Sequence, residues 1–193
     1  MYKSKCLDFF LLIFGVLCSD LQEDLAAIQN NPARAQFCSQ RLLCRTLAGN
    51  NVYILTITAP ASQEDMKRKQ VIVLSARVHP GETPSSWIMR GILHFLTGDS
   101  DVSTRLRDNF IFKIVPMLNP DGCIVGNTRC SLAARDLNRQ YKSVIKEAFP
   151  SVFNVKTLVR RYVSYFFNSD HIIEVFSALY QYFTYTKHVS NKA

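Results

Sequence analysis

His79 and Glu82 have the residue types and the spacing to bind a metal ion together. They stand at the two ends of a His-Pro-Gly-Glu segment, at the point where an apolar run of the chain stops. An imidazole nitrogen and a carboxylate oxygen both suit a borderline cation such as zinc. The pair also has a purely structural interpretation, in which His79 ends a strand and Glu82 stabilises the first turn of a helix. A zinc site is therefore the first hypothesis, and other residues must support it.

Later segments supply side chains that could hold an acidic group beside such a metal. Arg129 follows an Asn-Pro-Asp-Gly turn at residues 119–122, and Asn138 and Arg139 come soon after it. Guanidinium groups bind carboxylates through two parallel hydrogen bonds, which suits them to this task. The alternative is that both arginines form only surface ion pairs, worth roughly 0–1 kcal/mol each.

The elements that must position these residues are visible in the apolar pattern. Residues 71–76 form a short, β-branched run that predicts a strand buried on both faces of a largely parallel sheet. His79 then lies beyond the carboxyl end of that strand, where ligand sites of open α/β sheets collect. Pro80 and Gly81 supply a sharp turn before a helix expected over residues 85–96. The expected buried face of that helix consists of Trp87, Ile88, Gly91, Ile92 and Phe95.

Periodicity and turn residues place the remaining elements. A turn at residues 48–51 joins two expected strands as a hairpin. The full set comprises strands over 40–46, 52–58 and 110–115, helices over 21–30, 102–108, 134–148 and from 150 onward, and a polar loop over 60–70. No repeat or linker divides the chain, so we expect one α/β domain.

Four motifs, in this order, resemble those of the cytosolic carboxypeptidases, which are zinc enzymes that remove glutamate from protein tails, above all from tubulin. They are His-Pro-Gly-Glu at 79–82, Asn-Pro-Asp-Gly at 119–122, Asn-x-Arg-Cys-Ser-Leu at 127–132 and Asp-Leu-Asn-Arg at 136–139. The resemblance covers residues 21–161. It implies a fold of the α/β class with a carboxypeptidase-like mixed sheet flanked by helices.

The resemblance also implies a role for each candidate residue. His79 and Glu82 match two of the three protein ligands of a Zn2+ ion. Arg129 matches the residue that polarises the scissile carbonyl group. Asn138 and Arg139 match the clamp on the substrate's terminal carboxylate, which confines cleavage to the end of a chain. The Asn-Pro-Asp-Gly turn matches a structural turn beneath this site.

The sequence departs from the family pattern after residue 161. The family's third zinc ligand, a histidine in an Asp-x-His-Gly-His stretch, and its general-base glutamate have no match here. His171 and Glu174 are the nearest substitutes, and neither stands in the family's context. We therefore expect a partial peptidase domain over residues 21–161, incomplete at its carboxyl end, and a divergent tail over residues 162–193.

Charge and cysteine content narrow the choice of partners. Lysine and arginine number 23 against 15 acidic residues, and the resulting net charge of +8 favours acidic partners. Neither a zinc-finger nor an RNA-binding signature is present, so we expect acidic carboxyl-terminal tails, tubulin among them, and not nucleic acid. The 6 cysteines form no Cys-x-x-Cys pair, and we expect reduced thiols.

Residues 1–20 are an apolar segment whose role the sequence leaves open. Two lysines precede the apolar residues 7–17, as in a weak signal peptide, and the run is shorter than the roughly 20 residues of a membrane span. The alternatives are a buried element or sequence foreign to the family fold. The resemblance implies a cytoplasmic protein, whereas a signal peptide at residues 1–19 would imply a secreted one.

Two functions remain open from the sequence. The first is a zinc-dependent metallocarboxypeptidase that removes carboxyl-terminal glutamates from acidic protein tails. The second is an inactive fragment or isoform that lacks the third zinc ligand and the general base, and binds acidic tails without cleaving them. The motifs favour the first function for the gene, and the missing base favours the second for this chain.

Overall fold

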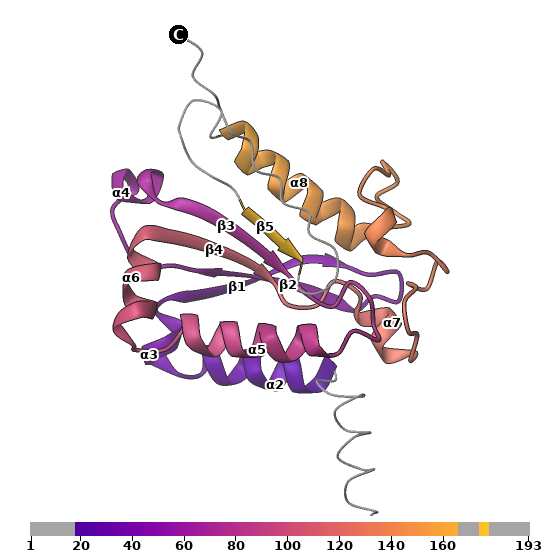
Figure 1. The fold of residues 1–193 in the computed structure, drawn as a ribbon, viewed down its shortest axis with the longest axis horizontal. Coiled ribbons are helices and arrows are strands. Elements are labelled where there is room, and N and C mark those ends of the chain that lie inside the picture. Colours follow the sequence, from indigo (N-terminus) through magenta and orange to yellow (C-terminus); the bar gives the residue numbers. More distant parts are fainter. Residues whose placement is uncertain (1–17, 166–173, 178–193) are drawn as a thin grey trace, which may run out of the picture.

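The computed structural model describes residues 18–165 and 174–177, which contain one mixed β-sheet (Figure 1). Its strands are β1 (Cys38–Arg45), β2 (Asn51–Ile57), β3 (Gln70–Ser75), β4 (Phe110–Val115) and β5 (Glu174–Ser177), in the spatial order β1-β2-β4-β3-β5. Strand β2 pairs antiparallel with β1 and β4, whereas β3 pairs parallel with β4 and β5. The expected mixed α/β sheet is thereby confirmed, and so is the β1–β2 hairpin.

Helices cover both faces of this sheet. They are α2 (Cys18–Gln29), α3 (Pro32–Ala35), α4 (Gln63–Arg68), α5 (Pro84–Leu96), α6 (Asp101–Asn109), α7 (Pro120–Ile124), the 3-10 helix η1 (Leu137–Arg139) and α8 (Pro150–Tyr165). Helices α2 and α5 lie side by side along one face, and α8 lies over the other (Figure 1). Ile114 of the sheet packs with Met89 and Leu93 of α5, and Val115 packs with Val152 of α8. Apolar burial on both faces thus holds the three layers together.

The central strand β4 carries the positions that connect the two cores. Its Phe112 and Ile114 belong to the core beneath α2 and α5, and its Ile111 and Val115 belong to the cores on the α8 side. Strand β3 lies beside it in parallel register, with Ser75 opposite Val115. Because both strands end at the same edge of the sheet, the segments that follow them emerge side by side.

The helix expected over residues 85–96 is present as α5, but the prediction of its buried face was wrong. Trp87, Ile88 and Phe95 expose 43, 44 and 46% of their surface, and the buried residues are Ser85, Ser86, Met89, Leu93 and Leu96. Ser85 and Ser86 lie inside because their hydroxyl groups accept hydrogen bonds from Arg77. Apolar periodicity gave the wrong buried face because α5 has apolar residues on two faces. The face that is buried begins with the polar residues Ser85 and Ser86.

A helix expected over residues 134–148 does not form. The chain there makes only η1 and a series of turns before α8 begins at Pro150. Ala134 has a left-handed φ of 53°, and the side chain of Asp136 accepts a hydrogen bond from the Asn138 backbone amide. A carboxylate that binds its own backbone two residues later competes with helical hydrogen bonds, which explains the error.

The polar loop expected over residues 60–70 contains a short helix, α4. The hydroxyl group of Ser62 accepts a hydrogen bond from the Asp65 amide and so caps the amino end of this helix. Ser62 and the acidic residues after it form an amino-terminal helix signal that the loop prediction overlooked.

Several expectations fall outside the described residues, namely those for residues 1–17, for His171 and for residues 178–193. Among the helices that the structure describes, none is long and apolar enough to cross a membrane. Within the same part of the chain, Cys18, Cys38, Cys44, Cys123 and Cys130 are free thiols.

The Asn-Pro-Asp-Gly segment opens helix α7 and carries a buried carboxylate, that of Asp121. This carboxylate accepts hydrogen bonds from Thr46 Oγ1, from the Ala48 amide and from Asn50 Nδ2, all in the turn between β1 and β2. Asp121 is only 5% exposed, so these three donors replace the water that it loses on folding. The segment therefore fastens the hairpin turn to the chain that leaves β4.

Replacing Asp121 with asparagine should destabilise the protein by roughly 1–3 kcal/mol, because an amide offers one acceptor oxygen where the carboxylate offers two. Urea denaturation would measure the change in the free energy of unfolding. Glu23→Gln removes the same charge from an exposed position on α2 and should stay within about 0.5 kcal/mol of wild type. Equal stabilities for the two variants would contradict the anchoring role of Asp121.

Candidate metal and substrate site

The loop after β3 is held in an unusual backbone conformation that turns His79 back over the edge of the sheet. Arg77 has a φ of 55°, in the left-handed region that side chains other than glycine disfavour. Its amide donates to Ser85 Oγ, and its Nε donates to the carbonyl oxygen of Pro80 at 2.6 Å. These bonds fix the loop from both ends, since Ser85 belongs to α5 and Pro80 follows His79 directly.

His79 and Glu82 face each other at the end of this loop. The Glu82 amide donates to the His79 carbonyl oxygen at 3.2 Å, which closes the turn. His79 Nδ1 lies 2.8 Å from Glu82 Oε1, and the histidine is only 5% exposed. The structure therefore brings together the two residues that the sequence singled out as metal ligands.

A third residue, Asp136, contacts the other side of the histidine ring. His79 Nε2 lies 2.9 Å from Asp136 Oδ1. The second oxygen of Asp136 accepts two hydrogen bonds from Arg129, from Nε at 2.9 Å and from a terminal nitrogen at 2.7 Å. Asp136 thus links the candidate metal ligand His79 to the candidate catalytic residue Arg129.

The electrostatics at Asp136 follow from these contacts. Burial alone would raise the pKa of its carboxyl group, but hydrogen bonds from His79, from the Asn138 amide and from Arg129 lower the pKa below its ordinary value. The carboxylate is therefore ionised at neutral pH and can hold the histidine ring in one orientation. Sequence reasoning missed this role, although Asp136 is the first residue of the Asp-Leu-Asn-Arg motif.

The two residues predicted to bind the substrate's carboxylate lie in η1, directly after Asp136. Asn138 is 8% exposed, and its amide donates to Asp136 Oδ1 at 2.9 Å. Arg139 is the next residue in η1 and is exposed. The structure thus brings the backbone of Asn138 to the centre of the site and places Arg139 at the surface beside it.

The donor atoms fit zinc in type, and their separation needs a small adjustment. Two ligand atoms bound to one tetrahedral zinc ion at about 2.1 Å lie roughly 3.4 Å apart. The 2.8 Å between His79 Nδ1 and Glu82 Oε1 would have to open slightly, which a rotation of the partly exposed Glu82 side chain allows. Asp136 faces the opposite ring nitrogen and would orient the ligand instead of binding the same ion.

His79 and Glu82 are two candidate ligands, whereas a catalytic zinc ion normally has three protein ligands. Among the described residues, no cluster of three or more histidine, cysteine, aspartate or glutamate side chains could hold a metal ion. His171, a candidate third ligand, lies outside the described residues. The backbone of Glu174, a candidate base, pairs with Ile72 inside β3, whereas His79 lies beyond the end of that strand. This register counts against Glu174 as the base.

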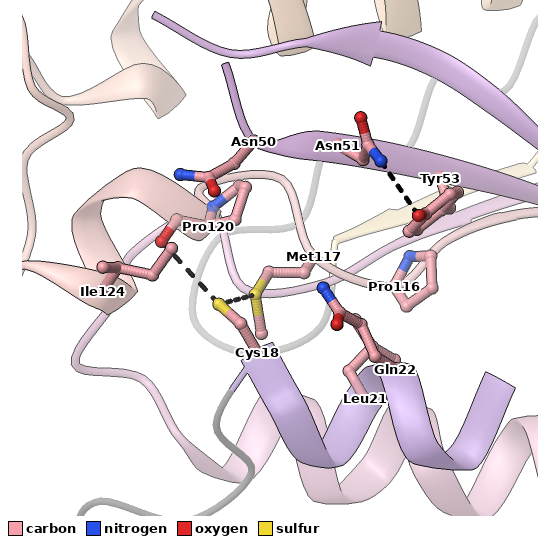
Figure 2. A pocket seen from close by; sticks show the side chains of 10 residues that line it. All are labelled: Cys18, Leu21, Gln22, Asn50, Asn51, Tyr53, Pro116, Met117, Pro120 and Ile124. Atoms are coloured by element: carbon pink, nitrogen blue, oxygen red, sulfur yellow. Dashed lines mark hydrogen bonds between the residues drawn. The ribbon is translucent and has the colours of Figure 1, made fainter. Parts of the chain in front are cut away.

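A pocket of about 50 Å³ lies apart from these residues, between α2, the start of β2 and α7 (Figure 2). The thiol of Cys18 points toward Met117 Sδ at 3.4 Å and toward the Pro120 carbonyl oxygen at 3.8 Å. Burial raises the pKa of this thiol, which makes it a poor nucleophile at neutral pH. None of the predicted site residues lines this pocket, so we assign it no part in the chemistry of His79.

A mixed sheet with a histidine and a glutamate converging beyond the carboxyl end of a parallel strand is the architecture of a metallocarboxypeptidase. The family profile of the zinc carboxypeptidases matches residues 27–169, and the chain belongs to this family.

Similar proteins agree with this assignment. The chain is 58% identical to cytosolic carboxypeptidase 3 of Mus musculus over 153 residues, which are 79% of this chain and 15% of that protein. It is 51% identical to cytosolic carboxypeptidase 2 of Homo sapiens over 154 residues, which are 79% of this chain and 17% of that protein. The chain therefore spans only about one sixth of the length of these relatives.

A solved structure shows the same fold. The metallo-carboxypeptidase from Burkholderia cenocepacia superposes with a TM-score of 0.68 at 29% sequence identity, over 82% of this chain and 40% of that chain. The likeness thus extends over most of the chain.

Asp136→Asn should change the state of the His79 ring, because the amide replaces a carboxylate that binds both the ring and Arg129. We expect the His79 Nε2 resonance to shift in a nitrogen–proton NMR spectrum of the histidine side chains, and the stability to fall by roughly 1–3 kcal/mol. His94, which contacts Arg34 and Asp24 elsewhere in the fold, provides an internal control that should not shift. An unchanged His79 spectrum would mean that Asp136 does not hold the ring.

Proposed function

We propose that this chain forms the metal-binding and substrate-binding part of a zinc-dependent metallocarboxypeptidase that removes glutamates from the ends of acidic protein tails, such as those of tubulin. The proposal rests on one observation above all. In a chain of the zinc carboxypeptidase family, Asp136 joins His79, the partner of Glu82, to Arg129. Within this proposal, residues 21–161 are the peptidase portion.

Each side chain has a definite task in this proposal. His79 and Glu82 would hold a zinc ion, which when bound would act as a Lewis acid and lower the pKa of a bound water. Asp136 fixes the orientation of the His79 ring and keeps its Nε2 occupied, so that Nδ1 faces Glu82. Arg129 places a positive charge where negative charge develops on the scissile carbonyl oxygen.

Recognition of the chain end falls to η1 and the residues around it. Asn138 offers an amide and Arg139 a guanidinium group for the terminal carboxylate of the substrate. Basic residues recur along the same segment, at Arg129, Arg135, Arg139, Lys142 and Lys146. This local excess of positive charge, together with the net charge of +8, supports an acidic tail as the substrate. The names of the cytosolic relatives support a cytoplasmic location.

A second candidate is a binding module that holds acidic tails without cleaving them. The observation in its favour is that the described residues contain no cluster of three side chains that could hold a metal ion. A site of this kind keeps the basic recognition surface and lacks the full ligand set for turnover.

One experiment on the purified chain distinguishes the metallocarboxypeptidase from the binding module. Zinc content would be measured by elemental analysis, and glutamate release from a polyglutamylated peptide would be followed by chromatography. About one equivalent of zinc with turnover supports the enzyme. Peptide binding without turnover supports the binding module, and neither binding nor turnover rejects both.

If the chain turns over, Arg129→Ala should lower kcat by roughly 100- to 1000-fold, because a developing oxyanion loses its positive neighbour. Steady-state kinetics on the same peptide would measure the loss. Arg105→Ala, which removes the same charge from an exposed position on α6, is the matched control and should retain wild-type kcat. Similar rates for the two variants would remove Arg129 from the catalytic machinery.

A further inference from the structure

The carbonyl groups of Thr128 and Cys130, the two residues that flank Arg129, lie against two glycines from other loops. Gly81, in the turn between His79 and Glu82, donates its amide proton to the Thr128 carbonyl oxygen at 2.8 Å. A Cβ atom at Gly81 would lie 2.8 Å from that same oxygen. A Cβ atom at Gly122 would lie 2.8 Å from the Cys130 carbonyl oxygen and 2.5 Å from Pro80 Cγ. Residues 128 and 130 are thus each pressed against a glycine.

The backbone conformation at positions 81 and 122 does not itself require glycine. Gly49 and Gly126 have positive φ angles of 81° and 78°, but Gly81 and Gly122 do not. Any residue could adopt the backbone angles at positions 81 and 122, so these sites need glycine because neighbouring backbone comes close. Both close approaches involve the same short loop, which carries Arg129.

Hydrogen bonds hold the turn that contains Gly122 against the segment before His79. The backbone amide of Asn119 donates to the Arg77 carbonyl oxygen at 3.2 Å. Its side-chain Nδ2 donates to the Val78 carbonyl oxygen at 3.3 Å. Asn119 Oδ1 accepts from the Gly122 amide at 3.0 Å. The turn at Gly122 is therefore fixed to the chain that leads into His79.

Asn127 completes the connection from this turn to the residues around Arg129. Its amide donates to the Gly122 carbonyl oxygen at 2.9 Å, and its Nδ2 donates to the Cys130 carbonyl oxygen at 3.0 Å. The contacts run from the His79 loop to the Gly122 turn, on to Arg129, and through Asp136 back to His79. These contacts form a closed circuit that includes His79.

We propose that Gly81 and Gly122 are positioning residues that set Arg129 against Asp136 and His79. The argument is one of distance. Real Cβ atoms essentially never come within 3.0 Å of such an atom, and ordinary contacts begin at 3.4 Å. A methyl group at either position would therefore push the neighbouring carbonyl away by at least 3.0 − 2.8 = 0.2 Å, and by 0.6 Å to reach an ordinary contact. Arg129 stands between the two displaced carbonyl groups, and such a shift would change its contacts with Asp136, which measure 2.9 and 2.7 Å.

The catalytic meaning of this geometry rests on the proposed function, but the geometry can be tested without turnover. Gly81→Ala and Gly122→Ala would be made in the full chain. NMR at a temperature where both remain folded would follow the Arg129 Nε–H and the His79 ring. We expect both signals to shift, and we expect hydrogen exchange at the Arg129 Nε–H to accelerate about tenfold, as for the loss of one charge-assisted hydrogen bond.

Two other glycines provide matched controls. A Cβ atom at Gly91 on α5 would meet nothing within 4 Å, so Gly91→Ala should change neither signal. A Cβ atom at Gly98 would lie 3.2 Å from the His94 carbonyl oxygen, far along the chain from Arg129. Gly98→Ala should therefore lower Tm while leaving the Arg129 and His79 signals in place. This control separates a positioning effect from a general loss of stability.

The proposal is overturned if Gly81→Ala and Gly122→Ala lower Tm as Gly98→Ala does, with the Arg129 and His79 signals unmoved. Should either variant fail to fold, Asn127→Ala decides, because it removes the bond to Cys130 without adding an atom. A shift of the Arg129 signal in that variant supports the proposal, and an unchanged signal rejects it. A wild-type chain with the expected signals but no glutamate release would reject the proposed function alone.

Discussion

The carboxylate of Asp136 is the contact on which the candidate site depends. It binds the ring of His79, the guanidinium group of Arg129 and the backbone amide of Asn138, which come from three separate stretches of the chain. A carboxylate that has lost most of its water needs such partners, because an unpaired ion in this position would be costly. The same contacts that lower its pKa therefore also bring the candidate ligand, the candidate catalytic arginine and the start of the carboxylate clamp to one place.

The sheet makes this convergence possible. Strands β3 and β4 are parallel neighbours in register, so the loop that carries His79 and the turn that follows β4 leave the same edge together. Asn119 then binds the carbonyl oxygens of Arg77 and Val78, and Asp121 fastens the same turn to the β1–β2 hairpin. The turn therefore supports the site from below without supplying a group to its chemistry.

Local pattern was enough to predict strands β1 to β4, and it failed at several other places. The helix expected from residue 150 onward is present as α8 to Tyr165, but residues 174–177 of the same segment form strand β5 instead. The apolar runs that became β3 and β4 were clear because buried parallel strands are β-branched throughout. The helix expected over residues 134–148 did not form, because Asp136 uses its side chain for His79, Arg129 and its own backbone. The buried face of α5 was misjudged because its first two inward residues are serines that serve Arg77. In both cases the deciding contacts are hydrogen bonds of polar side chains, which leave no trace in apolar periodicity.

The charged groups around His79 bear on cation binding and on catalysis in different ways. A neutral imidazole carries one N–H group, yet both ring nitrogens here face a carboxylate oxygen at 2.8 and 2.9 Å. Arg129 offsets the charge of Asp136, so Glu82 is the carboxylate whose charge these side chains leave uncompensated. The proposed cation binding on the Nδ1 side therefore draws on His79, Glu82, Asp136 and Arg129, whereas turnover needs a third ligand and a base as well.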